Sequence, residues 1–147
     1  MDRLILFLPR IDTENNNDND SDVKIGLRLP QTDEHRATKQ NIIILAEAEN
    51  AGFDSLWVLE RLIWPIGPQT RYPGSADGKL PADWQYIFDP LTLTYVAANT
   101  NKIALGTPVI DMLFHNPVIL AKRFATLDVL SEGRAIAGFG IGWSKDE

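Results

Sequence analysis

The apolar and polar positions from residue 23 onward predict four strands. Residues 23–30, VKIGLRLP, alternate apolar and polar side chains and end at a proline, which is typical of a strand. Residues 55–60, SLWVLE, predict a second strand, and residues 102–110, KIALGTPVI, are almost entirely apolar, as in a strand covered on both faces. The fourth strand is expected within GRAIAGFGIG, residues 133–142.

Helical spacing of apolar residues separates these strands. We expect a first helix between Asp33 and Ala51, stopped by Gly52. Its apolar face comprises Ile42, Leu45, Ala46 and Ala48. A second helix, from about Asp89 to Thr100, presents one face formed by Leu91, Thr94, Tyr95 and Ala98. A third helix begins near Pro117, which suits a first helical position, and is expected to bury Leu120, Phe124, Leu127 and Leu130.

The alternation of strands and helices predicts a parallel sheet with right-handed crossovers. The strands start near residues 23, 55, 102 and 133, which puts about 32 residues in an ordinary repeat of this kind. A (β/α)₈ barrel needs roughly 250 residues in eight such units, and residues 23–147 supply about half of that. The predicted fold is therefore α/β, of the (β/α)₈ TIM-barrel type, with only the first four βα units present: a half barrel.

An open doubly wound sheet is the rival architecture. Its dinucleotide fingerprint places G-x-G-x-x-G directly after the first strand and at the start of a helix. Here Gly138, Gly140 and Gly142 follow the last strand, and the first strand is followed by QTDEH. The absence of that fingerprint favours the half barrel.

Composition and charge narrow the classes of function. The chain has 147 residues, no Cys and two His, so it offers neither a disulfide framework nor metal-ligand spacing. Its net charge is −6, of which −4 lies in residues 1–22, where six acids face two arginines. The remainder is nearly neutral and lacks the basic patch that nucleic acid or an anionic membrane requires. No apolar run approaches the ~18 residues of a membrane span, and MDRLILFLPR lacks the features of a signal peptide, so we expect a cytoplasmic protein.

Two segments do not follow the strand and helix pattern. Residues 1–22 are expected to form a disordered, acidic and Asn-rich tail, because residues 11–22 have almost nothing to bury; an interaction tail is the alternative. Residues 23–147 form the half barrel. Within it, the Pro/Gly-rich residues 61–86 are too long for a plain connector and are either functional or mobile.

In a parallel barrel the site lies at the carboxyl ends of the strands. These ends are residues 30–31, 60–65, 107–115 and 140–147. Around them, KIALGTPVIDMLFHNPVILAKRFATLDVLSEGRAIAGFGIGW resembles the central signature of the luciferase-like monooxygenase family, with LGT, then LA-x-x-x-ATLD-x-LS-x-GR, then G-x-G-x-GW. The upstream AEAENAGFDSLWVLERLIWP is similar to the helix and second strand of that family.

This resemblance implies a chemistry. Members of the family are (β/α)₈ barrels that use FMN or the deazaflavin coenzyme F420 to oxidise, reduce or monooxygenate small organic molecules, and they bind the cofactor phosphate near the last strands. We therefore expect the N-terminal part of such an enzyme, either a truncated gene product or a fragment completed by a C-terminal half chain. The alternative is a non-catalytic half barrel that forms homo-oligomers through its open sheet edges.

The resemblance also implies cofactor-binding positions. Gly106, Thr107, Pro108 and Val109 end the third strand, where the family often has a strained non-prolyl cis peptide against the flavin ring. The bond between Pro108 and Val109 is the candidate, although the bond between Thr107 and Pro108 could itself be cis. Strand-end packing is the alternative role for Gly106 and Thr107.

The loop after the fourth strand supplies a second group of cofactor positions. Gly140 and Gly142 allow close approach of a ring to the backbone, Trp143 would line the pocket, and Asp146 follows in the same loop. Deazaflavin-using relatives often have an acid near the position of Trp143, so this tryptophan weakens an assignment to F420. FMN and coenzyme F420 therefore both remain candidates for the cofactor.

Four polar residues are candidates for catalysis. Glu60 and Arg61 occupy a pair that in many relatives is an acid followed by His; an arginine stays charged and only donates, so it could hold an anionic substrate or a reduced flavin. Asp111 could accept from a flavin ring or a substrate hydroxyl, and His115 could exchange a proton. The structural alternatives are a solvated Glu60–Arg61 pair, a turn capped by Asp111, and loop structure at His115.

Overall fold

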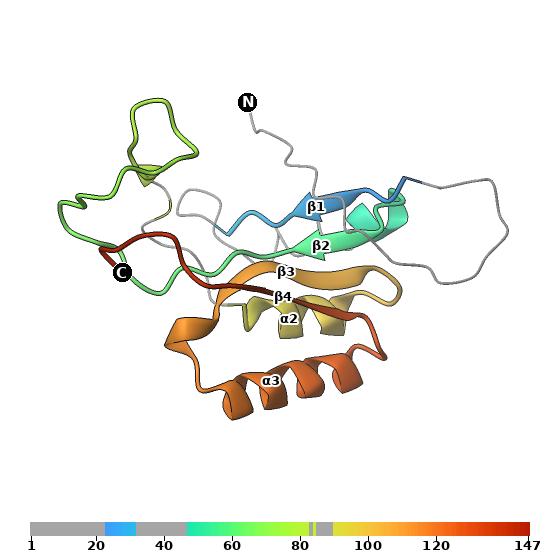
Figure 1. Cartoon of the computed structure of the whole chain (residues 1–147). Helices are drawn as coiled ribbons and strands as arrows, with labels where there is room; N and C mark the ends of the chain where they lie inside the picture. The colour runs from blue at the N-terminus through green and yellow to red at the C-terminus, as the bar shows by residue number, and fades with distance from the viewer. Residues whose placement is uncertain (1–22, 32–46, 83, 85–89) are drawn as a thin grey trace, which may run out of the picture.

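The computed structural model describes residues 23–31, 47–82, 84 and 90–147. Four parallel strands form one sheet in the order β1-β2-β3-β4 (Figure 1). Their bounds are β1 Gly26–Arg28, β2 Ser55–Trp57, β3 Ala104–Asp111 and β4 Ala135–Gly140. The predicted parallel α/β sheet is therefore confirmed. The predicted tail at residues 1–22 and most of the predicted first helix lie outside the described residues.

Residues 47–50 are helical, α2 is Thr92–Asn99, the 3₁₀ turn η3 is Met112–Phe114, and α3 is Pro117–Leu130. The two longest of these helices, α2 and α3, lie together on one side of the sheet (Figure 1). The predicted start of α3 is confirmed, because Pro117 is its first residue and the side chain of Asn116 accepts from two backbone N–H groups of its first turn. The predicted stop at Gly52 is also confirmed, since this residue has a φ of 85°.

The core lies between the sheet and the helices. Its members from the sheet include Leu56, Val58 and Leu105, and those from the helices include Leu93, Val96, Ala97 and Leu127. Side chains in a strand alternate between the two faces, so the residues between these core positions face the opposite side. There Trp57 packs against the backbones of Gly26 and Gly106 in the two neighbouring strands.

The predicted buried face of α2 was wrong. Leu93, Val96 and Ala97 are buried, whereas Leu91 is 72% exposed and Tyr95 is 43% exposed. The helical period was right but its phase was shifted, because the sheet contacts the side chains at i, i+3 and i+4 counted from Leu93.

The predicted face of α3 is only partly confirmed. Leu120 and Leu127 are buried, and Phe124 packs against Phe139 of β4 with ring centroids 5.7 Å apart. Leu130 is 61% exposed; it is the last residue of α3, directly before the C-cap Ser131.

Two charged side chains tie the helices to the amino ends of the strands. Glu49 accepts hydrogen bonds from the backbone N–H groups of Asn101, Lys102 and Ile103, directly before β3. Arg134, directly before β4, donates five hydrogen bonds to residues between the C-terminal end of α2 and the end of α3. These contacts satisfy backbone groups that helix and strand termini leave unpaired.

Candidate functional site

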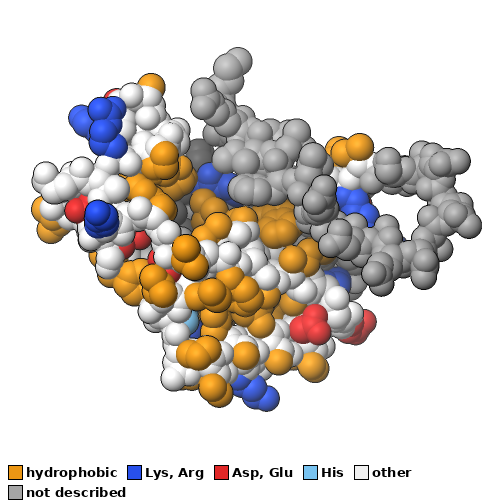
Figure 2. All heavy atoms as spheres, in the orientation of Figure 1, with side chains coloured by type: hydrophobic (Ala, Val, Ile, Leu, Met, Phe, Trp, Pro, Cys, Tyr) orange, Lys and Arg blue, Asp and Glu red, His pale blue; other side chains and the backbone are white. Residues whose placement is uncertain are grey.

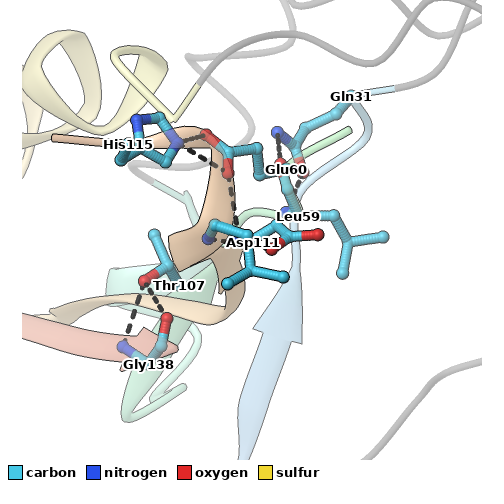
Figure 3. A network of polar contacts seen from close by, with 8 residues as sticks. Gln31, Leu59, Glu60, Thr107, Asp111, His115 and Gly138 are labelled. Carbon is cyan, nitrogen blue, oxygen red and sulfur yellow. Dashed lines mark hydrogen bonds and ion pairs between the residues drawn. The ribbon is translucent and has the colours of Figure 1, made fainter. Parts of the chain in front are cut away.

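A carboxylate at the end of β2 connects this strand to the segment that follows β3. Oε2 of Glu60 accepts the backbone N–H of Asp111 at 3.1 Å, and Nε2 of His115 lies 2.9 and 3.0 Å from the two carboxylate oxygens (Figure 3). The side chains of Glu60 and His115 are only 3% and 13% exposed. The structure therefore brings three of the four predicted catalytic residues together.

A primary amide joins the carboxyl ends of β1 and β2. Nε2 of Gln31 donates to the carbonyl oxygen of Leu59 at 3.1 Å, and the N–H of Leu59 donates to Oε1 of Gln31 at 2.5 Å (Figure 3). Gln31 is 1% exposed. Gln31 belongs to the predicted strand end at residues 30–31 but is not among the predicted site residues; its place directly after a strand-ending proline is the only sign of its role in the sequence.

Arg61 points to a different set of partners from those of Glu60. Its Nη2 donates to Oε1 of Glu147, and the two side chains are 8% and 13% exposed. Its guanidinium carbon lies 5.9 Å from the ring centroid of Trp64. Within the described part of the chain, Nε of Arg61 is buried and has no hydrogen-bond partner. A buried N–H without a partner is costly, so this atom is ready to donate to an acceptor.

Asp146 fixes the loop after β4 to the long segment after β2. Its Oδ2 accepts the backbone N–H of Thr70 at 2.7 Å. The backbone hydrogen bond from Thr70 is the largest cause that lowers the pKa of this carboxyl below its ordinary value. Nearby, Tyr72 packs against Trp143 and Trp84 with ring centroids 5.4 and 5.5 Å apart. The predicted cofactor positions Trp143 and Asp146 therefore lie against residues 61–84.

The carboxylate of Asp111 lies between η3 and the β4 loop. Its Oδ1 accepts the N–H of Leu113 at 3.2 Å and so caps η3. This is the structural role that the sequence offered as the alternative to catalysis for Asp111. A Cβ atom on Gly142 would lie 2.8 Å from Oδ2 of Asp111, and Gly142 has a φ of 74°. The structure thus places these two predicted site residues next to each other.

The strained peptide bond expected at the end of β3 is not present. No cis peptide bond occurs in the described ranges, so the bonds on both sides of Pro108 are trans. Instead, the pairing of β3 with β4 shifts register between Thr107 and Ile110. The hydroxyl of Thr107 bridges this irregularity, since it is 3.1 Å from both the N and the O of Gly138 (Figure 3).

Side chains occupy the space next to two of the predicted glycines. Trp57 covers Gly106, and a Cβ atom on Gly140 would lie 2.5 Å from Cγ1 of Val109. Val109 is itself 45% exposed, and Trp143 is 42% exposed. Val109 and Trp143 therefore each leave part of an apolar side chain open to solvent.

Glu60 and Arg61 are adjacent in the segment after β2 but have different surroundings. Glu60 and His115 line a hollow of about 450 Å³ together with side chains of α2 and α3. Arg61 is not part of that hollow, and its partners are Glu147 and Trp64. The structure therefore separates the predicted catalytic pair, because Glu60 lines the hollow whereas Arg61 contacts Glu147 and Trp64.

The described residues contain no group of three or more His, Asp or Glu side chains that could hold a metal ion. None of the helices described is long and apolar enough to cross a membrane.

Comparisons with known proteins place the chain in a family. Residues 11–147 match the luciferase-like monooxygenase family. An uncharacterised protein of Mycobacterium tuberculosis is 40% identical over 102 residues, which is 68% of this chain and 36% of that protein. The F420-dependent glucose-6-phosphate dehydrogenase of Kineococcus radiotolerans is 35% identical over 102 residues, which is 69% of this chain and 26% of that enzyme.

Solved structures match the fold of this chain. The oxygenating constituent of 3,6-diketocamphane monooxygenase from Pseudomonas putida, in complex with FMN, matches 82% of this chain with a TM-score of 0.60 and 22% identity. The coenzyme F420 dependent tetrahydromethanopterin reductase of Methanopyrus kandleri matches 82% with a TM-score of 0.57 and 27% identity. This chain covers 30% and 27% of those two chains.

These matches confirm the predicted fold class, four βα units of the (β/α)₈ TIM-barrel type. The chain spans about a third or less of the length of most of the relatives compared. By its sequence match over residues 11–147, the chain belongs to the luciferase-like monooxygenase family.

Proposed function

We propose that this chain supplies the N-terminal four βα units of an oxidoreductase or monooxygenase that uses FMN or coenzyme F420 and acts on a small organic molecule. The observation that carries the proposal is the polar cluster at the carboxyl ends of the strands, where Asp111 lies beside Gly142 and Arg61 pairs with Glu147. Active sites of parallel barrels lie at this end. The relatives named above include enzymes that carry FMN or depend on F420.

Arg61 is the residue best suited to a negatively charged group. Its guanidinium is buried, keeps its charge, and has an Nε–H without a partner among the residues described. We assign to it the binding of an anionic substrate group or of the reduced cofactor ring. Asp111, beside Gly142, would accept a hydrogen bond from the cofactor ring or from a substrate hydroxyl.

The cofactor would lie on the face of the sheet opposite α2 and α3. Val109 and Trp143 offer exposed apolar surface to a flat ring, and Gly142 and Asp146 belong to the loop beside it. Among the remaining predicted positions, Gly106 is covered by Trp57, Gly140 lies beside Val109, and Pro108 directly precedes Val109, whereas Thr107 lines the hollow on the helix side. When bound, a flavin or deazaflavin would supply the electron transfer; the protein positions it and excludes water.

A complete site requires more βα units than these four. The chain covers 26–36% of the relatives compared, and within the described residues the outer edge of β4 has no strand partner. We propose that a C-terminal half of the barrel pairs with this edge and completes the phosphate end of the cofactor site.

Titration of FMN and F420, followed by fluorescence, tests the proposal. The 147-residue chain is titrated alone and together with a separately expressed C-terminal half from a relative. We expect one of the two cofactors to bind, with at least tenfold weaker binding in Arg61→Ala and unchanged binding in Arg71→Ala, an exposed arginine of the same segment. Failure of both cofactors to bind in the presence of the complementary half would reject the enzyme proposal.

A second candidate function is that of a non-catalytic half barrel that self-associates. Exposed apolar side chains gather along β4 and α3 (Figure 2), including Phe139 at 47%, Ile141 at 74% and Val129 at 77%. A surface of this kind beside an unpaired strand edge favours association. This candidate predicts dimers by light scattering, loss of the dimer in Phe139→Ser with Ile141→Ser, and no cofactor binding. A monomer that binds cofactor tightly would contradict it.

A further inference from the structure

We propose that the hollow between α2, α3 and β3 is a second binding site, which takes a small, uncharged and largely apolar molecule carrying one hydroxyl or N–H donor. The hollow lies on the helix side of the sheet, whereas Trp57 and the proposed cofactor face lie on the other side. The inference therefore does not depend on the proposed oxidoreductase function.

The size and walls of the hollow suit such a molecule. Its volume is about 450 Å³, within the range of roughly 300–1,000 Å³ that is common for small-molecule sites. Most of the side chains around it are apolar, among them Leu93, Ile110, Leu120, Phe124 and Leu127. Apolar walls with a few polar groups at one place are typical of ligand sites rather than of an empty packing defect.

The uncharged and carboxylate polar groups of the hollow are the side chains of Glu60 and His115 together with three threonine hydroxyls. The hydroxyl of Thr107 already bonds to Gly138, that of Thr126 donates to the carbonyl oxygen of Lys122, and Thr94 lies on α2. Both oxygens of Glu60 are also engaged, one by the N–H of Asp111 and both by Nε2 of His115. A ligand therefore meets few open hydrogen-bonding positions.

The contact with Glu60 determines which nitrogen of His115 is open. A carboxylate only accepts, so the hydrogen in this contact is on Nε2 of His115. In a neutral imidazole the other nitrogen, Nδ1, is then a bare acceptor. Since His115 lines the hollow and is only 13% exposed, Nδ1 is the atom that a hydroxyl or N–H of a ligand would satisfy.

The surrounding charges exclude an ionic ligand from the inner part of the hollow. An anion would lie next to the carboxylate of Glu60, and an ammonium ion would find that carboxylate already occupied by His115 and Asp111. Lys122 and Arg123 contribute to the outer part, but both residues are exposed and keep their charges in water.

Two matched probes test the inference, 4-propylphenol and propylbenzene, which differ by one hydroxyl. Their binding to the 147-residue chain is measured by calorimetry, and the ring nitrogens of His115 are followed by ¹⁵N NMR. We expect the phenol to bind about tenfold more tightly, the size of one buried hydrogen bond, and to shift the Nδ1 resonance of His115. Propylbenzene is expected to leave that resonance nearly unchanged.

A variant separates the hydroxyl contact from apolar filling. In His115→Phe the ring remains but the acceptor is lost, so both probes should bind with similar affinity. The NMR measurement on the unaltered chain does not depend on the folding of this variant. The inference is overturned if neither probe binds at millimolar concentration, if the two bind equally to the unaltered chain, or if the phenol binds without moving Nδ1 of His115.

Discussion

Trp57 of β2 fills the space that a side chain at Gly106 of β3 would need. A Cβ atom on Gly106 would lie 2.5 Å from Cε3 and from Cζ3 of the indole, which is only 6% exposed. Real Cβ atoms essentially never show such a contact, so the indole would have to shift. The pair therefore fixes which residue types both strands accept on this face.

The change Gly106→Ala is expected to destabilise the protein by about 1–3 kcal/mol, as overpacking of a core does. Urea unfolding measures the effect. The double variant Gly106→Ala with Trp57→Phe provides the control, because a smaller ring leaves room for the methyl group. Its loss should be smaller than the sum of the two single losses; strict additivity would contradict a direct contact.

Glu49 is expected to stabilise the start of β3 in a pH-dependent way. Burial would raise the pKa of its carboxyl, but the N–H groups of Ile103, Lys102 and Asn101 outweigh burial and lower it below 4.5. A lowered pKa in the folded state means that the stabilisation is complete above about pH 4.5 and is lost as the pH falls through the folded pKa.

The change Glu49→Gln is expected to cost about 1–2 kcal/mol near pH 7, since it weakens charge-assisted hydrogen bonds. The difference from the unaltered chain should shrink below pH 4.5. Glu47→Gln is the matched control, because Glu47 is an exposed carboxylate in the same helical turn. Chemical unfolding at several pH values measures both variants, and an equal effect at both positions would argue against the N–H contacts as the cause.

Arg134 is expected to be irreplaceable by lysine. Its Nε donates to the carbonyl of Ser131 at 2.7 Å, and its Nη1 donates to Oγ1 of Thr100 at 2.8 Å and to the carbonyl of Ile103 at 3.0 Å. Its Nη2 donates to the carbonyls of Ala97 in α2 and of Thr100, the C-cap of α2. A lysine ammonium has three donors at one point and does not reach this spread of acceptors.

We expect Arg134→Lys to cost about 2–3 kcal/mol, because hydrogen bonds from a charged group are lost and carbonyl groups stay buried without donors. The exposed Arg71 serves as the control position, where the same exchange should change the free energy of unfolding by less than about 0.5 kcal/mol. Thermal unfolding compares the two, and an unchanged Tm in Arg134→Lys would contradict the proposed role.

The amide of Gln31 must donate as well as accept, so Gln31→Glu should loosen the link between β1 and β2. The introduced carboxylate would face the carbonyl oxygen of Leu59. At neutral pH we expect a loss of about 1–3 kcal/mol, and the loss should decrease at acidic pH, where a protonated glutamate donates again. The control is Gln69→Glu, whose amide donates to Gly67 at an exposed site. Urea unfolding at two pH values distinguishes these outcomes.

The architecture followed from the sequence because its causes are local. Alternation, apolar runs, Pro117 and Gly52 sufficed to place the four strands and the start and stop of helices. The rotation of α2 about its axis could not be predicted from the sequence. Leu91 and Leu93 are equally apolar, and only contact with the sheet selects which of them is buried. Phase is a tertiary property that a short apolar pattern leaves undetermined.

The candidate site could be located from the sequence, but its internal connections could not. Placing Glu60, Asp111 and His115 at strand ends needed only the rule for parallel barrels. Where each of these side chains lies depends on the register shift after Thr107 and on the pairing of His115 with Glu60. Gln31 and Arg134 were missed because their partners are backbone atoms far away in the sequence.

The clamps made by Glu49 and Arg134 lie where the chain enters β3 and β4, while the network around Glu60 lies where the chain leaves β2 and β3. Substitutions in the network around Glu60 therefore leave the contacts of Glu49 and Arg134 intact. The loops after the strands can therefore acquire residues that bind new ligands, while the contacts before the strands continue to stabilise the fold.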